Sequence, residues 1–421
     1  MKVGAFDLRD PPDVDGIRTC VHCGICLPQC PTYRLLGEEM DSPRGRIYLM
    51  RAALEGRVAM SETFTRHLDL CLGCRACETA CPSGVPFGRL LEQTRGQIVR
   101  QGNQRIAQRL LARLALTLFP YPRRLAFAMG VLSYYQRSGL QRLVRASRLL
   151  GVAPRLAATE RSLPSLPSGS TPALPEMIPA QGPSRGRVGL LIGCVQRFVM
   201  PRVNELTARL LSMAGYDVLI PREQGCCGAL HLHAGRLGEA RRLARAILDT
   251  FDQSVDLVVV NAAGCGSAMR AYGHWLHDDP RATTFSQAVR DVSELLVDAD
   301  LPLRRIEETA TYHDACHLAH GQRVRAQPRV LLQKIPGLTL VELPDSDLCC
   351  GSAGIYNILE PEMADRLLEL KVGRIAETQA RIVVTGNVGC ALQIAKGCRA
   401  RGLNAEVLHP VELLERALSH R

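Results

Sequence analysis

Two runs of cysteine near the N-terminus have the spacing that iron–sulfur chemistry requires. Each run reads C-x2-C-x2-C-x3-C-P, the first over residues 20–31 and the second over residues 71–82. Three thiolates spaced in this way can wrap one four-iron cube, and the fourth ligates the neighbouring cluster. We therefore predict two [4Fe–4S] clusters with crossed ligand sets: Cys20, Cys23, Cys26 and Cys81 for cluster 1, and Cys71, Cys74, Cys77 and Cys30 for cluster 2.

Other uses of cysteine fit this spacing less well. Zinc sites use two C-x2-C pairs rather than two runs of four, and disulfide frameworks belong to small secreted chains. This chain has 421 residues and 17 cysteines. Residues 1–14 lack the apolar core of a secretory signal. The sequence also has no run of 18 apolar residues, which a membrane-spanning helix would need. We therefore expect a cytoplasmic location, where thiolates stay reduced.

Eight further cysteines recur in register in the C-terminal half of the chain. Corresponding positions of the two copies stand 122 to 125 residues apart, and each copy contains a Cys-Cys-Gly triplet. A register kept over this distance indicates an internal repeat. The repeated residues are Cys194, Cys226, Cys227 and Cys265 in the first copy, and Cys316, Cys349, Cys350 and Cys390 in the second.

The elements that must position these cysteines follow the order strand, helix, strand, helix, strand in both copies. Strands are expected at residues 188–192, 216–220, 257–260, 309–313, 338–343 and 382–385. This order predicts parallel sheets with right-handed crossovers, in which ligands bind beyond the carboxyl ends of the strands. Every repeated cysteine follows a strand, so the four of each copy should converge on one site. Gly228 and Gly351 would allow close backbone approach there.

The repeated cysteines could hold an iron–sulfur cluster, hold zinc, or stay as thiols. Thiolates favour both kinds of metal site, but adjacent cysteines are unusual ligands because successive side chains of an extended backbone point to opposite sides. Five histidines lie close to these cysteines in the sequence, and for them we expect packing or hydrogen bonding rather than metal ligation. They are His231, His233, His313, His317 and His320.

Composition divides the chain into five segments. We expect residues 1–100 to form a small helical two-cluster domain, in which the clusters replace much of the core. Basic amphipathic helices follow at residues 101–153, a proline-rich linker at residues 154–186, and the two repeats at residues 187–303 and 304–421. The net charge of +11 is concentrated in residues 93–159, which hold twelve arginines and no Asp, Glu or Lys. The arginine-rich helices, divided by Pro120 and Pro122, present either a solvated face or a docking face for a partner or an anionic membrane. No nucleic-acid-binding motif accompanies them, and we expect no nucleic acid.

Together these motifs resemble the iron–sulfur subunits of glycolate oxidase. The resemblance rests on the segments around both cysteine runs, on Ser42-Pro-Arg-Gly-Arg-Ile-Tyr48, and on both Cys-Cys-Gly regions. It implies a mixed fold, with an α-helical ferredoxin-like domain followed by a duplicated α/β domain of the CCG type that heterodisulfide reductases also contain. The full CCG motif ends in C-x2-C, whereas here Cys265 and Cys390 have no such second cysteine.

The resemblance also implies a role. Family members sit with FAD-binding subunits that oxidise glycolate, often also D-lactate, and the iron–sulfur subunit carries the electrons toward a quinone, peripheral to the inner face of the cytoplasmic membrane. The sequence shows no catalytic triad, phosphate-binding loop or dinucleotide motif, so we expect no catalytic residues of its own. Two alternatives are the iron–sulfur subunit of an anaerobic glycerol-3-phosphate or D-lactate dehydrogenase, and a thiol–disulfide reductase. A non-catalytic scaffold with structural metal is a third.

Overall fold

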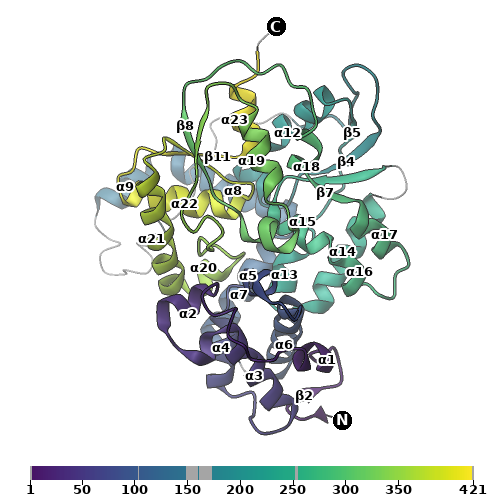
Figure 1. The fold of residues 1–421 in the computed structure, drawn as a ribbon, viewed down its shortest axis with the longest axis vertical. Helices are drawn as coiled ribbons and strands as arrows, with labels where there is room; N and C mark the ends of the chain where they lie inside the picture. The colour runs from purple at the N-terminus through teal and green to yellow at the C-terminus, as the bar shows by residue number, and fades with distance from the viewer. Residues whose placement is uncertain (1, 103, 148–159, 161–172, 252–254, 420–421) are drawn as a thin grey trace.

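The structure, a computed structural model, describes residues 2–102, 104–147, 160, 173–251 and 255–419. A helical N-terminal part is followed by two parallel sheets with helices around them (Figure 1). This arrangement confirms the predicted mixed fold class. Among the described residues, none of the helices is both long and apolar enough to cross a membrane.

The N-terminal helices surround an apolar core. Ser42 caps the helix α3, because its hydroxyl accepts a hydrogen bond from the Gly45 amide and Pro43 takes the first helical position. We expected clusters to replace much of the core, but Phe64 and Leu90 are among many buried apolar side chains between the helices. The elements are β1 (Lys2–Val3), β2 (Phe6–Asp7), α1 (Val14–Arg18), α2 (Pro31–Leu36), η1 (Glu39–Asp41), α3 (Pro43–Leu54), α4 (Glu62–Asp69), α5 (Ala76–Ala80) and α6 (Phe87–Gln101).

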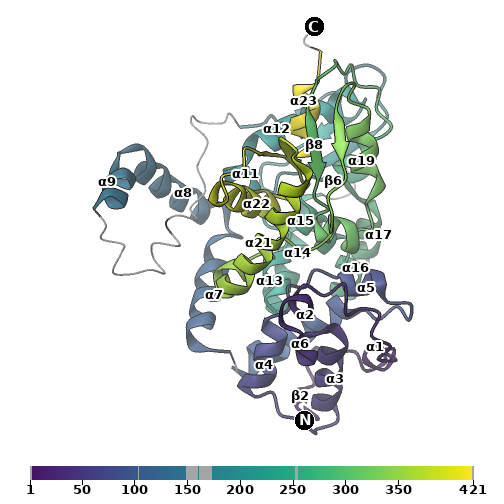
Figure 2. The same cartoon turned by 60° about the vertical axis from the view of Figure 1, so that its left-hand side comes forward.

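The arginine-rich helices form an arm beside the body of the protein. They are α7 (Ile106–Leu118), α8 (Pro122–Arg137) and α9 (Leu140–Ala146). The break before α8 falls at the predicted prolines, but Gly139 adds a second break because it takes a left-handed φ of 81°. Helix α7 packs Ala112 and Leu116 against Ile355, whereas α8 and α9 stand away from the body (Figure 2).

Most of the predicted linker lies outside the described residues, namely 154–159 and 161–172. Its C-terminal end differs from the prediction of an extended linker. There β3 (Met177–Ile178) pairs antiparallel with a strand of the first sheet. The end of the segment is therefore part of the first repeat.

Each repeat contains a parallel sheet in the expected order of elements. The first sheet has the order β3-β5-β4-β6-β7 and the second β11-β10-β8-β9, and only the β3–β5 pair is antiparallel. The first repeat contains β4 (Arg187–Leu191), α11 (Gln196–Val199), α12 (Pro201–Met213), β5 (Asp217–Leu219), α13 (Ala229–His233), α14 (Leu237–Thr250), β6 (Leu257–Val260), α15 (Ala263–Met269), α16 (Tyr272–Trp275), α17 (Arg281–Ala288), β7 (Val289–Asp291) and α18 (Val292–Leu296). The second contains β8 (Thr309–Tyr312), η3 (His317–Gly321), α19 (Ala326–Gln333), β9 (Thr339–Val341), α20 (Tyr356–Leu359), α21 (Pro361–Thr378), β10 (Ile382–Val384), α22 (Val388–Ala400), β11 (Glu406–Leu408) and α23 (Pro410–Arg416).

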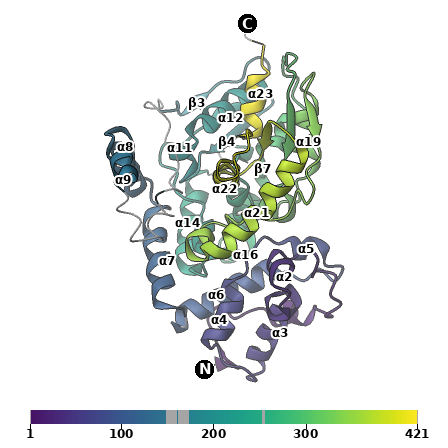
Figure 3. The same ribbon diagram turned by 90° about the vertical axis from the view of Figure 1, so that its left-hand side faces the viewer.

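The two repeats share one apolar core, which holds their sheets in a fixed relation. Helices α12, α18, α19 and α23 pack together between the sheets. Buried side chains from both repeats, such as Leu210 and Leu413, belong to the same cluster. The N-terminal helices lie at one end of this double domain, next to both repeats (Figure 3). This arrangement brings the ferredoxin-type cysteines close to the repeated ones.

Candidate iron–sulfur and metal centres

The cysteines predicted for cluster 2 surround one buried cavity. Its lining includes the side chains of Cys30, Cys71, Cys74 and Cys77, together with Arg46. All four cysteines are at most 9% exposed. Burial raises the pKa of the Cys74 and Cys77 thiols well above the usual range, and metal ligation is what holds such thiols in the thiolate form. The site therefore fits a soft, cationic metal cluster.

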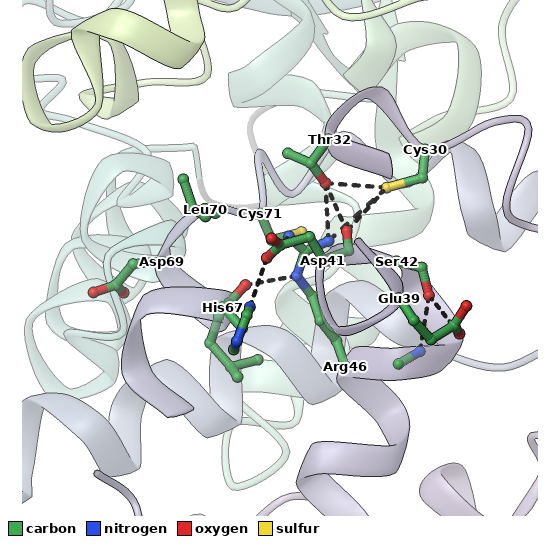
Figure 4. A network of polar contacts seen from close by, with 12 residues as sticks. Cys30, Thr32, Glu39, Asp41, Ser42, Arg46, His67, Asp69, Leu70 and Cys71 are labelled. Carbon is green, nitrogen blue, oxygen red and sulfur yellow. Dashed lines mark hydrogen bonds and ion pairs between the residues drawn. The ribbon is translucent and has the colours of Figure 1, made fainter. Parts of the chain in front are cut away.

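A buried guanidinium borders the same cavity. Arg46, which is fully buried, lies with Nη1 3.9 Å from the Cys30 sulfur and 3.1 Å from the Thr32 hydroxyl (Figure 4). Its Nε donates to the His67 carbonyl at 2.7 Å, and its Nη2 lies 3.5 Å from the Asp41 carboxylate. Such a cation opposes the negative charge that four thiolates bring to a cluster. Sequence analysis did not single out this network.

The cysteines predicted for cluster 1 lie nearer the surface. Cys23 is exposed, and Cys20, Cys26 and Cys81 are half-buried. Burial raises the pKa of Cys20, and the neighbouring thiols of Cys81 and Cys23 raise it further. The Cys81 thiol therefore lies near Cys20 of the first run, as the crossed arrangement requires. Ligation of both clusters by these sets stays a prediction.

The four cysteines of each repeat converge beyond the ends of the parallel strands. All eight are free cysteines. In the first repeat the Cys226 thiol is close enough to influence the Cys194 and Cys227 thiols, and the Cys227 thiol also interacts with Cys265. In the second repeat the Cys349 thiol interacts in the same way with Cys316 and Cys350, and the Cys350 thiol with Cys390 and the His313 ring. These neighbours lower the pKa of Cys227 and Cys350, because the thiolate of each can accept from two adjacent thiols.

The glycines of the two triplets allow the close approach that the sequence predicted. Gly228 and Gly351 have left-handed φ angles of 82° and 87°. A side chain at Gly228 would meet the Ala240 carbonyl oxygen at 2.8 Å, and one at Gly351 would meet the Ala364 oxygen at 2.5 Å. The triplets therefore pack directly on helices α14 and α21.

The loop of the second cysteine run is held against both repeats. The Tyr356 hydroxyl donates to the Leu70 carbonyl at 3.0 Å, and a nitrogen of His317 lies 3.1 Å from the Gly73 carbonyl. The Arg95 guanidinium donates hydrogen bonds to both the Cys71 carbonyl and the His233 carbonyl of the first repeat. In addition, the Cys74 thiol packs in one cluster with Cys316 and Cys349 of the second repeat.

The five histidines divide into two groups. His233 bonds with Glu92 at 2.8 Å, and its ring lies against the His317 ring at a tilt of 40°. His317 bonds with the Gly73 carbonyl, and His320 bonds with Thr79 at 3.0 Å. The expectation of hydrogen-bonding roles is confirmed for these three. Among the described residues, His231 Nδ1, His233 Nε2, His320 Nε2 and both ring nitrogens of His313 are buried without a nitrogen or oxygen partner, and the His313 ring lies next to the Cys350 thiol.

A second cavity lies where the N-terminal domain meets both repeats. Cys71, Asp69 and Arg95 line it from the N-terminal domain, His233 from the first repeat and Tyr356 from the second. Burial raises the pKa of Asp69 to about 6. The cavity therefore combines apolar walls, the Arg95 cation and one carboxyl group, Asp69, that can exchange a proton near neutral pH. No sequence motif marked this site, because its residues come from distant segments.

Comparisons with known proteins agree with this architecture. A 4Fe-4S dicluster domain matches residues 16–85, a linker region of glycolate oxidase iron-sulfur subunits residues 107–163, and a cysteine-rich domain residues 188–270 and 310–395. The probable glycolate oxidase iron-sulfur subunit of Bacillus subtilis (strain 168) is 40% identical over 436 residues, which cover 100% of this chain and 98% of that protein. The glycolate oxidase iron-sulfur subunit of Escherichia coli (strain K12) is 34% identical, covering 96% of this chain and 94% of that protein.

A more distant relative shares only part of the chain. Lactate utilization protein A of Oceanobacillus iheyensis is 30% identical over 236 residues, which cover 54% of this chain and 96% of that protein. The dicluster and cysteine-rich domains of these comparisons support iron–sulfur clusters as the cofactors.

Proposed function

Because this chain belongs to the family of glycolate oxidase iron–sulfur subunits, we propose that it relays electrons from an FAD-bearing partner subunit toward a quinone or another acceptor. The partner oxidises glycolate or D-lactate. The eight ferredoxin-type cysteines hold two [4Fe–4S] clusters, which when bound take up and release single electrons. The chain's own residues position these clusters, set the charge around them and provide the surfaces on which both neighbours dock.

The observation that carries this proposal is the gradient of exposure along the cysteines. Cys23 of the first set is exposed, the second set is buried, and Cys74 of that set packs against Cys316. In this order the cysteine sets mark a path for electrons from the surface to the centre of the molecule. The cavity beside Cys71 lies at the inner end of that line, where a quinone headgroup would find Arg95 and Asp69 as hydrogen-bonding partners.

The partner's docking surface is assigned to the loop of cluster 1. Val21 and Ile25 lie between the first three cysteines of the first run, and their side chains are 69% and 53% exposed. Exposed apolar side chains around a functional group are typical of an interaction site. Electrons need a short path, so the flavin-bearing subunit must cover this loop.

The double variant Val21→Glu/Ile25→Glu tests the proposal in the complex purified with its natural flavoprotein. We expect substrate-driven reduction of the clusters to slow by at least about tenfold, since apolar anchors of an interface contribute more than about 1 kcal/mol each. The bleaching of visible cluster absorbance after addition of glycolate, D-lactate or glycerol-3-phosphate measures the rate and identifies the substrate. Reduction by dithionite, which needs no partner, should be unchanged.

A matched control places the same charges elsewhere. Val330 and Leu370 are 43% and 42% exposed on the second repeat, and Val330→Glu/Leu370→Glu should leave the rate unchanged. Equal slowing in both double variants would refute this docking surface. Bleaching by none of the three substrates would refute the proposed function itself.

We further propose that the arm of α7 and α8 contacts an anionic membrane surface. Leu114 and Phe127 are 65% and 76% exposed, and Arg109, Arg113 and Arg123 are exposed on the same helices. Exposed apolar and aromatic side chains among arginines are typical of helices that lie in the membrane interface. Such contact would place the relay next to membrane quinones.

Removal of those three arginines should weaken binding to anionic vesicles. Each basic residue near an anionic surface contributes about 1 kcal/mol, so the triple change to glutamine should lower the affinity by roughly two orders of magnitude. Co-sedimentation of the full chain with vesicles that contain anionic or only zwitterionic lipid measures this. Glutamine at Arg304, Arg399 and Arg401, which are exposed on the second repeat, is the control; an equal loss there would contradict a role for the arm.

A further inference from the structure

A lysine side chain lies completely buried in the second repeat. Lys371 is one of four lysines in the chain, and its exposed fraction is 0%. It comes from α21, and its Nζ donates to the carbonyl oxygens of Asp345 and Ser346 at 2.5 and 3.1 Å. Both acceptors are neutral, whereas a buried ammonium is costly unless an opposite charge lies nearby. The position of Lys371 therefore calls for a negatively charged partner.

The two carboxylates that act on Lys371 form ion pairs with other residues. Asp345 pairs with Arg34 of the N-terminal domain at 3.0 Å, and Asp347 pairs with Arg325 at 2.8 Å. Each of these ion pairs already balances the negative charge of its carboxylate. The charge that balances Lys371 must therefore come from another group.

The thiols of the Cys-Cys-Gly triplet provide that charge. Burial lowers the pKa of Lys371 to about 8, so the ammonium stays charged at neutral pH, and Cys350 and Cys349 oppose this shift more strongly than either carboxylate does. Cys350 packs with Leu368 in one apolar cluster, and Cys349 packs with Leu367 in another. Because both leucines lie one turn before Lys371 on α21, the ammonium and the two thiols share one face of this helix.

The first repeat has an apolar residue at the corresponding position. Helices α14 and α21 begin 124 residues apart, so Ile247 is the counterpart of Lys371. The same offset separates Ala240 and Ala364, which the glycines of the two triplets approach. Ile247 is fully buried in the apolar cluster that contains the triplet cysteines of its own repeat. A cation at this point of the helix is therefore a property of the second repeat.

The first repeat has a different cation in a different place. Arg197 on α11 donates to the carbonyls of Gly193 and Gln224 at 2.5 and 3.0 Å. Burial lowers the pKa of Arg197, and the Cys194 and Cys226 thiols oppose this shift. Its side chain is partly exposed, so water and salt screen its charge more than that of a buried lysine. The two cysteine sites therefore differ in their electrostatic surroundings.

We propose that Lys371 is a positioning residue that balances the charge of the second repeat's cysteine site and raises the reduction potential of the iron–sulfur centre held there. A positive charge nearby favours the more negative, reduced state of such a centre. The ammonium acts through its charge on Cys350 and Cys349 and does not ligate the metal. This inference rests on the proposed electron relay and deepens it, because two sites with the same cysteines thereby obtain different potentials.

Redox titration of the anaerobically purified full chain, followed by electron paramagnetic resonance, tests the proposal. The signal that Cys350→Ser removes or alters identifies the centre of the second repeat. In Lys371→Met, the ratio of reduced to oxidised centre for this signal should be at least about tenfold lower at a fixed potential, which corresponds to about 59 mV for one electron. The other signals should keep their potentials.

Two further variants separate the charge of Lys371 from its hydrogen bonds. Lys371→Gln can still donate to the loop carbonyls but has no charge, so its potential should match that of Lys371→Met. Lys371→Arg keeps a cation and should stay close to the natural potential. A natural potential in Lys371→Gln would show that the lysine only holds the loop. If Lys371→Met did not fold, the glutamine and arginine variants would decide.

Lys396→Met is the matched control. Lys396 lies in the same repeat but pairs with Asp365 and is 32% exposed, so its loss should leave the potential unchanged. An unchanged potential in Lys371→Met, or an equal fall in Lys396→Met, would overturn the proposal. So would a Cys350→Ser protein with every signal intact, because no redox centre would then lie at the site. The titration needs no partner subunit, so its result is independent of the substrate-driven reduction that tests the proposed function.

Discussion

Replacement of Cys30 by alanine should halve the iron of the protein, from about eight to about four atoms per chain. The iron should be lost from cluster 2, although Cys30 belongs to the first cysteine run. Cys30 lines the cavity of Cys71, Cys74 and Cys77, and a four-iron cluster with three thiolates in a buried site has no protein ligand on its fourth iron. Anaerobic iron and sulfide analysis of the full chain measures the loss.

Double variants identify which cluster is lost without any assignment of spectra. Cys30→Ala/Cys77→Ala should contain as much iron as Cys30→Ala alone, because both residues serve one cluster. Cys30→Ala/Cys23→Ala should contain almost none. The reverse pattern would show that each run ligates its own cluster, in contradiction of crossed ligation. Cys398→Ala, a change at a cysteine that is 1% exposed and belongs to neither run, controls for the loss of a buried thiol.

The second large effect is expected at Arg46. Its change to methionine keeps the aliphatic stem but leaves the Asp41 carboxylate, which is 1% exposed, without its cation. Removal of one member of a buried ion pair costs about 3–5 kcal/mol, so the free energy of unfolding should fall by that amount. Anaerobic urea titration followed by circular dichroism measures it. The reduction potential of cluster 2 should also fall, because the lost positive charge favoured the reduced cluster.

Arg44 provides the matched control, because it is two residues from Arg46 in the sequence but does not belong to the buried network. It pairs with Glu39 through side chains that are 31% and 41% exposed, and exposed pairs contribute about 0–1 kcal/mol. Arg44→Met should therefore change the stability by less than about 1 kcal/mol and leave the potential of cluster 2 where it was. Similar effects of both changes would contradict a special role for Arg46.

Sequence patterns predicted those parts of the structure that depend on short-range spacing. The strand at residues 257–260 has the expected bounds, because a run of β-branched residues is a local signal. The convergence of the repeated cysteines was also predictable, since it follows from the order of strands and helices.

Other parts depend on contacts between distant segments, for which no spacing rule exists. Strands β7 (Val289–Asp291) and β11 (Glu406–Leu408) were missed because charged residues interrupt their short apolar runs. Arg46 is buried because Asp41, Thr32 and His67 surround it, whereas its residue type alone predicts exposure.

The hydrogen bond from Tyr356 to the Leu70 carbonyl joins residues 286 positions apart, which bears on how the protein is made. A ribosome that adds about 5–20 residues per second needs roughly 15–60 s to cover that distance. Throughout this interval the loop with Cys71 and Cys74 has no second repeat to enclose it. Iron and sulfide could therefore reach the nascent loop directly, whereas in the finished protein the second repeat covers it.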